Sequence, residues 1–316
     1  MNKLLSVIIP AYNEELMIQK TAEVISNILK TSGIEYELIF VNDGSKDASW
    51  NEIVKTQEKN SRIKGINFSR NFGKESAIYA GMYYAKGDCC VVIDCDLQHP
   101  PERIVDMYRL WEDGYEIIEA VKASRGKESV FYAAGASGFY KIISTVTGID
   151  MKKASDFKLL DRKAVTVLLN MREKNTFFRA LSSWIGFKTT QIEFDVQERV
   201  LGESKWSSWA LIKYAFSNIT SFSTAPLQIV TFLGLIMLVA SIILSINSLY
   251  QKFMGIALGG FTTVILLQLF TGSIIMISLG IIGYYIAKIY EEVQGRPRFI
   301  ISETCGEMKD ENDEEK

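Results

Sequence analysis

The chain has 316 residues, which allows one large domain or two smaller ones. Its 35 Lys and Arg side chains are matched by 37 Asp and Glu side chains, so the composition excludes the strongly basic surface of a nucleic-acid binder. The four cysteines fit no zinc-binding spacing, and we expect them to be reduced, buried thiols.

Apolar runs alternate with helical segments over about the first 125 residues. Several of these runs are apolar throughout, as expected of strands that are buried on both faces. We therefore predict an α/β fold with a mostly parallel sheet and helices on both faces. We expect no signal peptide, because the first apolar run is short and lacks a cleavage region. The predicted strands are 5–10, 36–43, 63–69 and 89–94, and the predicted helices are 14–31, 47–59 and 74–86.

The pattern is less regular between about 126 and 200. Beyond it, Trp206 and Trp209 stand in an amphipathic segment beside lysines. This favours a helix that lies on a membrane surface over an ordinary surface helix. The sequence predicts a helix within 129–146, a short strand leading into a helix within 154–171, a strand within 187–199, and the amphipathic helix over 206–223.

Two long apolar stretches follow, at about 226–250 and 261–287, and neither contains a charged residue. Each exceeds the roughly 20 residues that a bilayer core requires, whereas buried helices of soluble proteins are usually shorter and keep a polar stripe. The flanking cations predict that both flanks and both termini are cytoplasmic. We therefore expect a catalytic domain over 1–205, the amphipathic helix over 206–223, two transmembrane helices within 224–290, and a cytoplasmic tail over 291–316 with a disordered end.

Polar loops follow the four predicted strands, and they read PAYNEE, NDGSKD, SRNFGK and DCDLQHPPE. Ligands of open parallel sheets bind at the carboxyl ends of the strands, so these loops are expected to form one site. Asp94 and Asp96 could hold a divalent cation there, or they could close a strand at the solvent edge. Neither a dinucleotide-binding fingerprint nor a P-loop is present.

The motifs together carry a family resemblance. In chain order they are SVIIPAYNEE, VNDGSKDAS, SRNFGKESAIYAG, DCDLQHPPE, SDFKLLDR, RVLGESKW and VQGRPRF. With them the chain resembles family 2 glycosyltransferases of the polyprenyl-phosphate type, similar to dolichol-phosphate mannose synthases and bactoprenol glucosyltransferases. The resemblance implies a GT-A-type, Rossmann-like domain followed by a two-helix transmembrane hairpin.

The resemblance also implies an activity. A sugar would pass, with inversion, from a nucleotide sugar to polyprenyl (undecaprenyl) phosphate at the cytoplasmic face of a bacterial-type membrane, for modification of cell-envelope glycans. Mg²⁺ or Mn²⁺ would be the cofactor. A UDP-sugar such as UDP-glucose or UDP-N-acetylglucosamine is favoured as donor, with GDP-mannose as the alternative. The partners would be donor, lipid and membrane without nucleic acid, and homo-oligomerisation stays open.

Carried over by position, the resemblance implies a role for each site residue. It places Asp156 and Asp96 at catalytic positions and Asp94 and Asp96 at the metal. For Asp43 and Asp156, turn and cap duty is the alternative. His99 is left open as a metal or phosphate contact. The nucleotide contacts would be Pro10, Tyr12, Asn13, Glu15, Asp43 and Asp94; the donor sugar and diphosphate contacts Gln98 and Lys74; and the acceptor-phosphate contacts Lys122, Arg125, Ser137, Arg199 and Lys205.

The chain also departs from the family pattern. Relatives often carry arginines in the segment that matches residues 126–140, which here holds alanines and glycines, and Lys158 stands where they commonly have Arg. A processive polysaccharide synthase is disfavoured, because no Q-x-x-R-W motif occurs. A membrane-anchored, non-catalytic sensor of nucleotide sugars is a further alternative, which the intact Asp94 and Asp96 pair disfavours.

Overall fold

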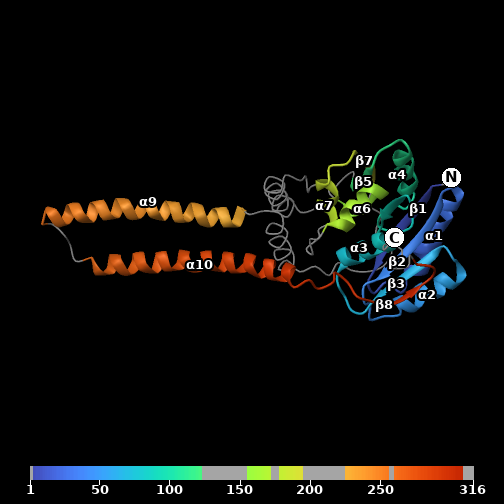
Figure 1. Ribbon diagram of the computed structural model, residues 1–316, viewed down its shortest axis with the longest axis horizontal. Coiled ribbons are helices and arrows are strands. Elements are labelled where there is room, and N and C mark those ends of the chain that lie inside the picture. The colour runs from blue at the N-terminus through green and yellow to red at the C-terminus, as the bar shows by residue number, and fades with distance from the viewer. Residues whose placement is uncertain (1–2, 123–154, 172–177, 195–224, 256–259, 309–316) are drawn as a thin grey trace. The chain divides into compact units, whose positions relative to one another are not determined.

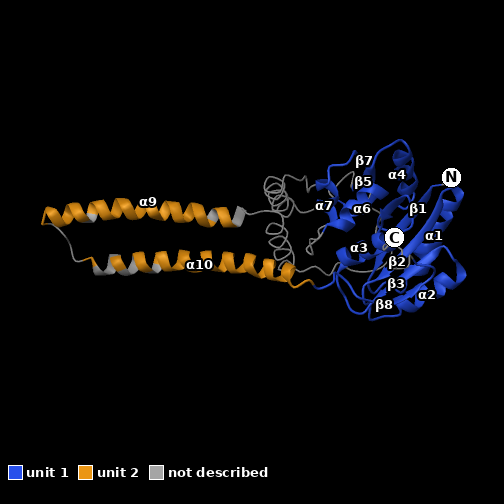
Figure 2. Cartoon of the chain, in the orientation of Figure 1, with its two compact units in different colours: residues 1–205, 296–316 blue, residues 206–295 orange. Residues whose placement is uncertain are grey.

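The protein is described from a computed structural model, which covers residues 3–122, 155–171, 178–194, 225–255 and 260–308 (Figure 1). The chain divides into two compact units. Unit 1 comprises residues 1–205 together with 296–316, and unit 2 comprises residues 206–295 (Figure 2). The residues from 296 onward therefore belong to the same unit as the N-terminal region.

Unit 1 is built on an eight-stranded sheet with the strand order β7-β5-β6-β4-β1-β2-β3-β8. The pairs β1–β2, β1–β4, β2–β3 and β5–β7 are parallel, whereas β4–β6, β5–β6 and β3–β8 are antiparallel. The strands are β1 (Leu4–Ala11), β2 (Glu35–Asn42), β3 (Ile63–Phe68), β4 (Cys89–Val92), β5 (Ile117–Lys122), β6 (Lys158–Asp161), β7 (Thr189–Phe194) and β8 (Ile301–Cys305).

Helices cover both faces of this sheet, which confirms the predicted fold class. Because successive side chains of a strand point to opposite faces, Val7 and Ile9 of β1 join a core cluster with residues of α1, α2 and α4. Ile8 points the other way and packs closely on Gly81 of α3. The helices of unit 1 are α1 (Ile18–Thr31), α2 (Ser49–Lys59), α3 (Lys74–Tyr84), α4 (Arg103–Glu112), α6 (Arg162–Asn170) and α7 (Phe178–Trp184).

Some boundaries and elements differ from the sequence-based predictions. Helix α1 begins at Ile18 and not at 14, because the chain first makes a turn in which Met17 donates to the carbonyl of Glu14. Strands β5 and β8 and helix α7 were not predicted. Strand β8 (ISETC) is polar and mostly exposed, so it lacks the apolar pattern by which buried strands are recognised. The predicted tail thus contains a strand of the sheet.

Unit 2 contains two long helices, α9 (Ala225–Phe253) and α10 (Phe261–Val293). Both contain a 24-residue stretch, Val230–Phe253 and Phe270–Val293, that is long and apolar enough to cross a membrane, with mean hydropathy 2.3 and 1.7. The most apolar part of each stretch is exposed and not buried, which disfavours the alternative of core helices. The amphipathic helix predicted over 206–223 lies outside the described residues.

Candidate active site

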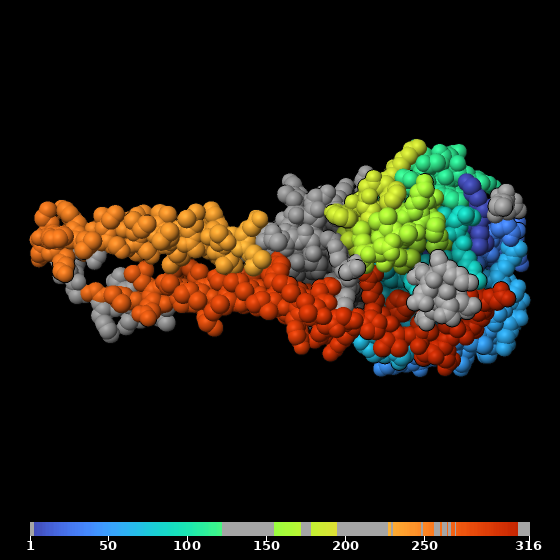
Figure 3. Space-filling model, viewed as in Figure 1, coloured from blue at the N-terminus to red at the C-terminus, as the bar shows by residue number. Residues whose placement is uncertain are grey.

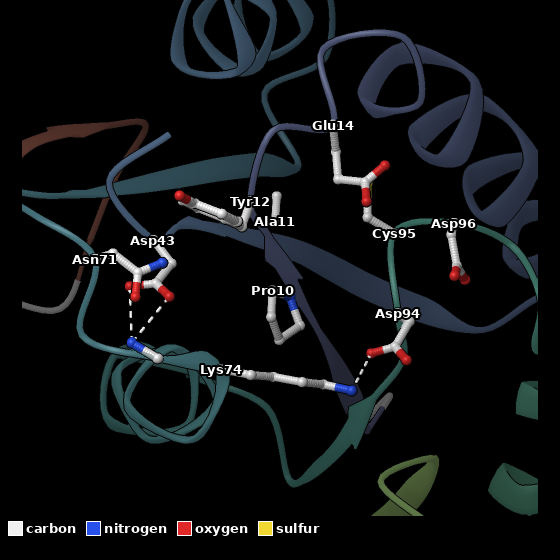
Figure 4. Close-up of a pocket in the computed structure, with 11 residues that line it drawn as sticks. Pro10, Ala11, Tyr12, Glu14, Asp43, Asn71, Lys74, Asp94, Cys95 and Asp96 are labelled. Carbon is white, nitrogen blue, oxygen red and sulfur yellow. Dashed lines mark hydrogen bonds and ion pairs between the residues drawn. The ribbon is translucent and has the colours of Figure 1, made fainter. Parts of the chain in front are cut away.

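A cavity of about 320 Å³ lies at the carboxyl ends of the parallel strands (Figure 4). Its volume falls at the small end of the roughly 300–1,000 Å³ typical of ligand pockets. All four loops that follow β1 to β4 contribute to its lining, so they meet in one place as expected. The lining residues are Pro10, Ala11, Tyr12, Glu14, Asp43, Asn71, Gly73, Lys74, Asp94, Cys95 and Asp96.

Lys74, the first residue of α3, connects two acidic residues that are distant in the sequence. Its Nζ lies 2.5 Å from Oδ1 of Asp94 and 2.9 Å from Oδ2 of Asp156 (Figure 4 shows the first of these contacts). Partial burial by itself would lower the pKa of Lys74, but the two carboxylates outweigh it and raise that pKa above its ordinary value. The ammonium group is therefore charged and held between the β4 loop and the start of β6.

Asp156 receives a second cation, Arg179 of α7. The guanidinium donates from Nε to Oδ1 at 2.6 Å and from Nη2 to Oδ2 at 2.7 Å, which is the strong fork geometry of an arginine and a carboxylate. Asp156 is 5% exposed. Burial would raise its pKa, but Lys74 and Arg179 hold that pKa well below its usual range. Asp156 is therefore an ionised carboxylate between two cations.

Arg179 is a site residue that the sequence analysis missed. It lies 23 positions after Asp156, and no periodicity or spacing rule connects the two residues. The only signal in the sequence is a single cation within an otherwise apolar and small-residue segment, FFRALSSW. Such a residue can equally be a surface arginine.

Lys158, the departure from the family pattern noted in the sequence, is the first residue of β6 and fixes α7. It is fully buried, and its Nζ contacts Oε1 of Glu119 at 2.6 Å, Oγ of Ser182 at 2.8 Å and the carbonyl oxygen of Arg179 at 3.2 Å. Burial lowers the pKa of Lys158, and the carboxylate of Glu119 opposes this. The ion pair holds the backbone that carries Arg179, because a buried charge needs such partners.

Asp43 ties the loop after β2 to the loop after β3. It is 3% exposed, and its carboxylate accepts hydrogen bonds from the backbone nitrogens of Phe72 at 2.6 Å and Gly73 at 2.9 Å. Burial raises the pKa of Asp43, and the two backbone donors oppose the shift. Gly73 has φ +98°, a backbone conformation that favours glycine. Asp43 therefore stabilises the backbone of the neighbouring loop and also lines the cavity.

The predicted nucleotide contacts in the first loop have different positions. Tyr12 is 44% exposed and lines the cavity, whereas Asn13 and Glu15 link this loop to the next. Oδ1 of Asn13 accepts from the nitrogen of Lys46 at 2.9 Å, and Oε2 of Glu15 accepts from the nitrogen of Ala48 at 2.8 Å, where α2 begins. Glu14, which was not predicted, faces the cavity instead, while Pro10 also lines it.

Asp96 is held by its own turn. Its Oδ1 accepts a hydrogen bond from the backbone nitrogen of Gln98 at 3.0 Å, and the intervening Leu97 adopts φ +56°. Gln98 itself is not among the residues that line the cavity.

His99 stacks on Phe157 with ring centroids 5.1 Å apart, and burial lowers the pKa of its imidazole. Its Nδ1 lies 3.9 Å from Oδ2 of Asp94.

The carboxylates of Asp94 and Asp96 fit a hard divalent cation. Mg²⁺ and similar ions are often bound by one or two carboxylates, with waters and substrate phosphates completing the shell. Both side chains line the same cavity. Within the described ranges no cluster of three or more His, Cys, Asp or Glu side chains could hold an ion by protein ligands alone. Asp94 and Asp96 are thus the two carboxylates that could hold such an ion in this cavity.

Of the five residues predicted to contact the acceptor phosphate, the structure describes only Lys122. Lys122 ends β5, where its backbone pairs in register with Phe194 of β7. Arg125, Ser137, Arg199 and Lys205 lie outside the described residues. Their assignment stays a prediction.

Glu75 leads to a prediction about pH. Its Oε2 accepts a hydrogen bond from the backbone nitrogen of Phe178 at 2.8 Å, and burial, together with the charge of Asp156, raises its pKa from 4.5 to about 7. A raised carboxyl pKa means that the folded state binds the proton more tightly than the unfolded state. The contribution of Glu75 to the free energy of unfolding is therefore fully present below about pH 4.5 and is lost as the pH rises to about 7.

We expect Glu75→Gln to remove this dependence of stability on pH, because the amide oxygen can accept the same hydrogen bond and carries no charge at any pH. The measurement is the midpoint of thermal unfolding of the full chain in detergent, compared between the two proteins at a series of pH values. The difference between variant and wild type should grow in favour of the variant as the pH rises. A difference that does not change with pH would contradict the raised pKa of Glu75.

Similar proteins were found both by family and by individual sequence. A family model described as glycosyl transferase family 2 matches residues 6–167. An uncharacterised glycosyltransferase of Bacillus subtilis, YkcC, is 40% identical over 95% of this chain and 94% of its own length. A prophage bactoprenol glucosyl transferase homolog of Escherichia coli is 33% identical over 94% of this chain and 98% of its own. The bactoprenol glucosyl transferase of Shigella phage SfII is also 33% identical, over 95% and 98%.

Proposed function

Because the chain belongs to glycosyl transferase family 2, and is therefore a glycosyltransferase, we propose that it transfers a sugar from a nucleotide sugar to a polyprenyl phosphate. Support for the acceptor comes from relatives that are named bactoprenol glucosyl transferases and match at least 94% of this chain. The observation that carries the proposal is the cavity in which Asp94, Asp96 and Lys74 meet.

The donor would bind in this cavity through its nucleoside diphosphate. Tyr12 and Asp43 would contact the nucleoside side, and Asp94 and Asp96 would hold Mg²⁺ or Mn²⁺ against the diphosphate. When bound, such an ion neutralises charge on the phosphates and on the departing nucleoside diphosphate. The Lys74 ammonium lies 2.5 Å from Oδ1 of Asp94, so it would add a second positive charge at the same place. A UDP-sugar is the favoured donor.

The lipid phosphate would attack the anomeric carbon directly. A phosphate monoester has a second pKa of about 6, so near neutral pH it is mostly dianionic and needs no base to become a nucleophile. One of its oxygens would form the new bond to the anomeric carbon as the bond to the diphosphate breaks on the opposite face. The configuration would invert, and the nucleoside diphosphate would leave.

Asp156 would orient the reacting groups and would not take up a proton. Its two oxygens already accept from Lys74 and Arg179, and the low pKa that these cations impose makes it a poor base near neutral pH. Its negative charge would instead hold both cations toward the place where donor and acceptor phosphates meet. This is electrostatic preorganisation, in which charged groups are fixed before the reaction begins.

The two apolar helices would anchor the enzyme beside its lipid substrate. Val230–Phe253 and Phe270–Val293 would each span the membrane. Lys205 and Lys213 precede the first span, and Arg296 and Arg298 follow the second, so both flanks would face the cytoplasm. A cytoplasmic site gives the transferase access to soluble nucleotide sugars.

A panel of labelled donors tests this proposal. The full chain in detergent is incubated with undecaprenyl phosphate, Mg²⁺ or Mn²⁺, and labelled UDP-glucose, UDP-N-acetylglucosamine or GDP-mannose, and label is measured in the lipid extract. We expect one UDP-sugar to label the lipid, and omission of undecaprenyl phosphate to abolish the signal. Label from GDP-mannose alone would identify the mannose synthase alternative. No label from any nucleotide sugar would overturn the enzymatic function.

A further inference from the structure

The segment that follows α10 has no role in the proposed chemistry, yet it is attached firmly to unit 1. We define it as the C-terminal segment, residues 296–305, which includes most of the GRPRF motif. Its strand β8 pairs antiparallel with β3, in the register Asn67↔Glu303 and Phe68↔Ile301. In the space-filling view this red segment lies on the surface of unit 1 beside light-blue atoms (Figure 3). Because β8 is mostly exposed, apolar burial alone does not account for this attachment.

The start of the C-terminal segment contacts the end of β3 and the helix that follows it. Phe299 stacks on Phe68, with ring centroids 5.3 Å apart and planes 10° from parallel. Arg298 places its guanidinium 4.6 Å from the ring centroid of Tyr79 in α3 and donates to the carbonyl oxygen of Met171 after α6. The backbone nitrogen of Ser69 donates to the carbonyl oxygen of Ile300 at 3.0 Å. The segment therefore contacts the residue at which the loop 69–73 begins and the helix α3 that follows this loop.

These contacts continue to the cavity. Phe72 and Phe68 form a T-shaped pair, with ring centroids 5.7 Å apart and planes at 89°. The backbone nitrogens of Phe72 and Gly73 donate to Asp43, and the next residue is Lys74, which reaches Asp94. Phe299, Phe68 and Phe72 thus form a continuous aromatic row that ends at the cavity lining.

We propose that Phe299 is a positioning residue of the donor site, which it supports through Phe68 and Phe72. The inference rests on the proposed function, because it assumes that a nucleoside diphosphate occupies the cavity. The loop 69–73 is a connection whose backbone must be ordered to bind the donor, and ordering a loop costs conformational entropy. The aromatic row orders the loop already in the free protein, so donor binding does not lose this entropy. Without it the loop is ordered only on binding, and donor affinity falls.

The test compares Phe299→Ala with wild type in the full chain. The probes are UDP and GDP with Mn²⁺, measured by equilibrium binding, followed by steady-state kinetics with the donor that the panel identifies. We expect the Kd of the nucleoside diphosphate and the KM of the donor to rise about tenfold, since small misplacements in a site are costly. The KM of undecaprenyl phosphate should be unchanged and kcat should change less than the KM of the donor. Phe299→Tyr, which keeps the stacking, should restore binding.

Glu303→Ala is the matched control. Glu303 lies on the same segment, and its Oε2 accepts from Nε1 of Trp50 at 2.6 Å, away from the loop 69–73. This variant weakens the attachment of β8 but leaves the aromatic row intact, so nucleotide affinity should not change. In a Phe72→Ala background, the effect of Phe299→Ala on affinity should largely disappear, because residues that act through one another are not additive.

The outcomes separate the two proposals. If Phe299→Ala lowers the unfolding midpoint but binds UDP or GDP as wild type does, Phe299 has a structural role only and the inference is wrong. If Phe299→Ala does not fold, Phe299→Leu keeps the apolar bulk without the stacked ring, and the same comparison decides. If the wild-type chain binds neither UDP nor GDP, the proposed function fails, and the inference fails with it.

Discussion

Asp156→Asn is expected to reduce sugar transfer by at least about a hundredfold, the loss seen when one preorganised electrostatic group is removed from a site. The amide keeps the size of the side chain but removes the negative charge between Lys74 and Arg179. The two cations then repel each other without a carboxylate between them. Lys74 would turn toward Asp94 alone, and Arg179 would lose its fork partner.

The expected cost in folding stability is smaller than for a fully buried pair. Removing one member of a buried ion pair typically costs about 3–5 kcal/mol. Here the side chains of Lys74 and Arg179 are 38% and 37% exposed, so water can screen the charges that remain. We therefore expect a folded variant with a lowered unfolding midpoint. Lipid-extractable label and thermal unfolding, measured on the same preparation, distinguish inactivity from unfolding.

Asp161→Asn is the control for this experiment. Asp161 ends β6, the strand that begins two residues after Asp156, and its Oδ1 accepts from the backbone nitrogen of Lys163 as the N-terminal cap of α6. Asn caps helices about as well as Asp, but its amide nitrogen cannot accept the hydrogen bond that Nε1 of Trp111 donates to Oδ2 of Asp161 at 2.8 Å. The variant therefore removes one charge outside the cavity lining, and we expect a lowered unfolding midpoint. It should retain transfer. If Asp156→Asn transferred sugar as fast as Asp161→Asn, the electrostatic role of Asp156 would be wrong.

Asp96→Asn is expected to lower transfer by about a thousandfold at a metal concentration that saturates wild type, since a bound ion contributes several kcal/mol of charge stabilisation. The substitution is conservative for the fold. Oδ1 of Asn can still accept the hydrogen bond that Gln98 donates to Asp96 at 3.0 Å, so the turn at Leu97 is retained. What is lost is an anionic ligand for the cation.

The measurement is the rate of lipid labelling over a titration of Mg²⁺ and, separately, of Mn²⁺. The variant should require more metal for half-maximal activity and reach a lower maximum. Asp106→Asn is the control, because Asp106 is exposed on α4 and pairs only at the surface with Arg103 at 2.8 Å. Unchanged lipid glycosylation by Asp96→Asn would falsify the assignment of Asp96 to a catalytic metal.

The resemblance to family 2 glycosyltransferases was evident in the sequence and is confirmed by the family match over residues 6–167. The mostly parallel sheet with helices on both faces is also confirmed. Strands β1 to β4 were recognisable because each is locally apolar and is followed by a polar loop. Since parallel strands present their carboxyl ends at one edge, the convergence of PAYNEE, NDGSKD, SRNFGK and DCDLQHPPE could be predicted without coordinates.

The connections within the site could not be predicted in the same way. Arg179 meets Asp156 only because Lys158, Ser182 and Glu119 fix α7 against β5 and β6. Glu14 and Glu15 are neighbours in sequence, but the turn before α1 directs the first toward the cavity and the second toward α2. Such directions depend on packing between distant elements, which no local pattern records.

The α/β class, the four loops that carry the site, the two apolar helices and the family could all be inferred from the amino-acid sequence. Two further features are visible only in the folded chain: Lys74 bridges Asp94 and Asp156, and β8 returns to pair with β3 beside the loop 69–73. The physical reason is the range of the interactions. Apolar periodicity is set by neighbouring residues, whereas the backbone hydrogen bonds of a sheet edge and the pairing of buried charges join residues that only the folded chain brings together.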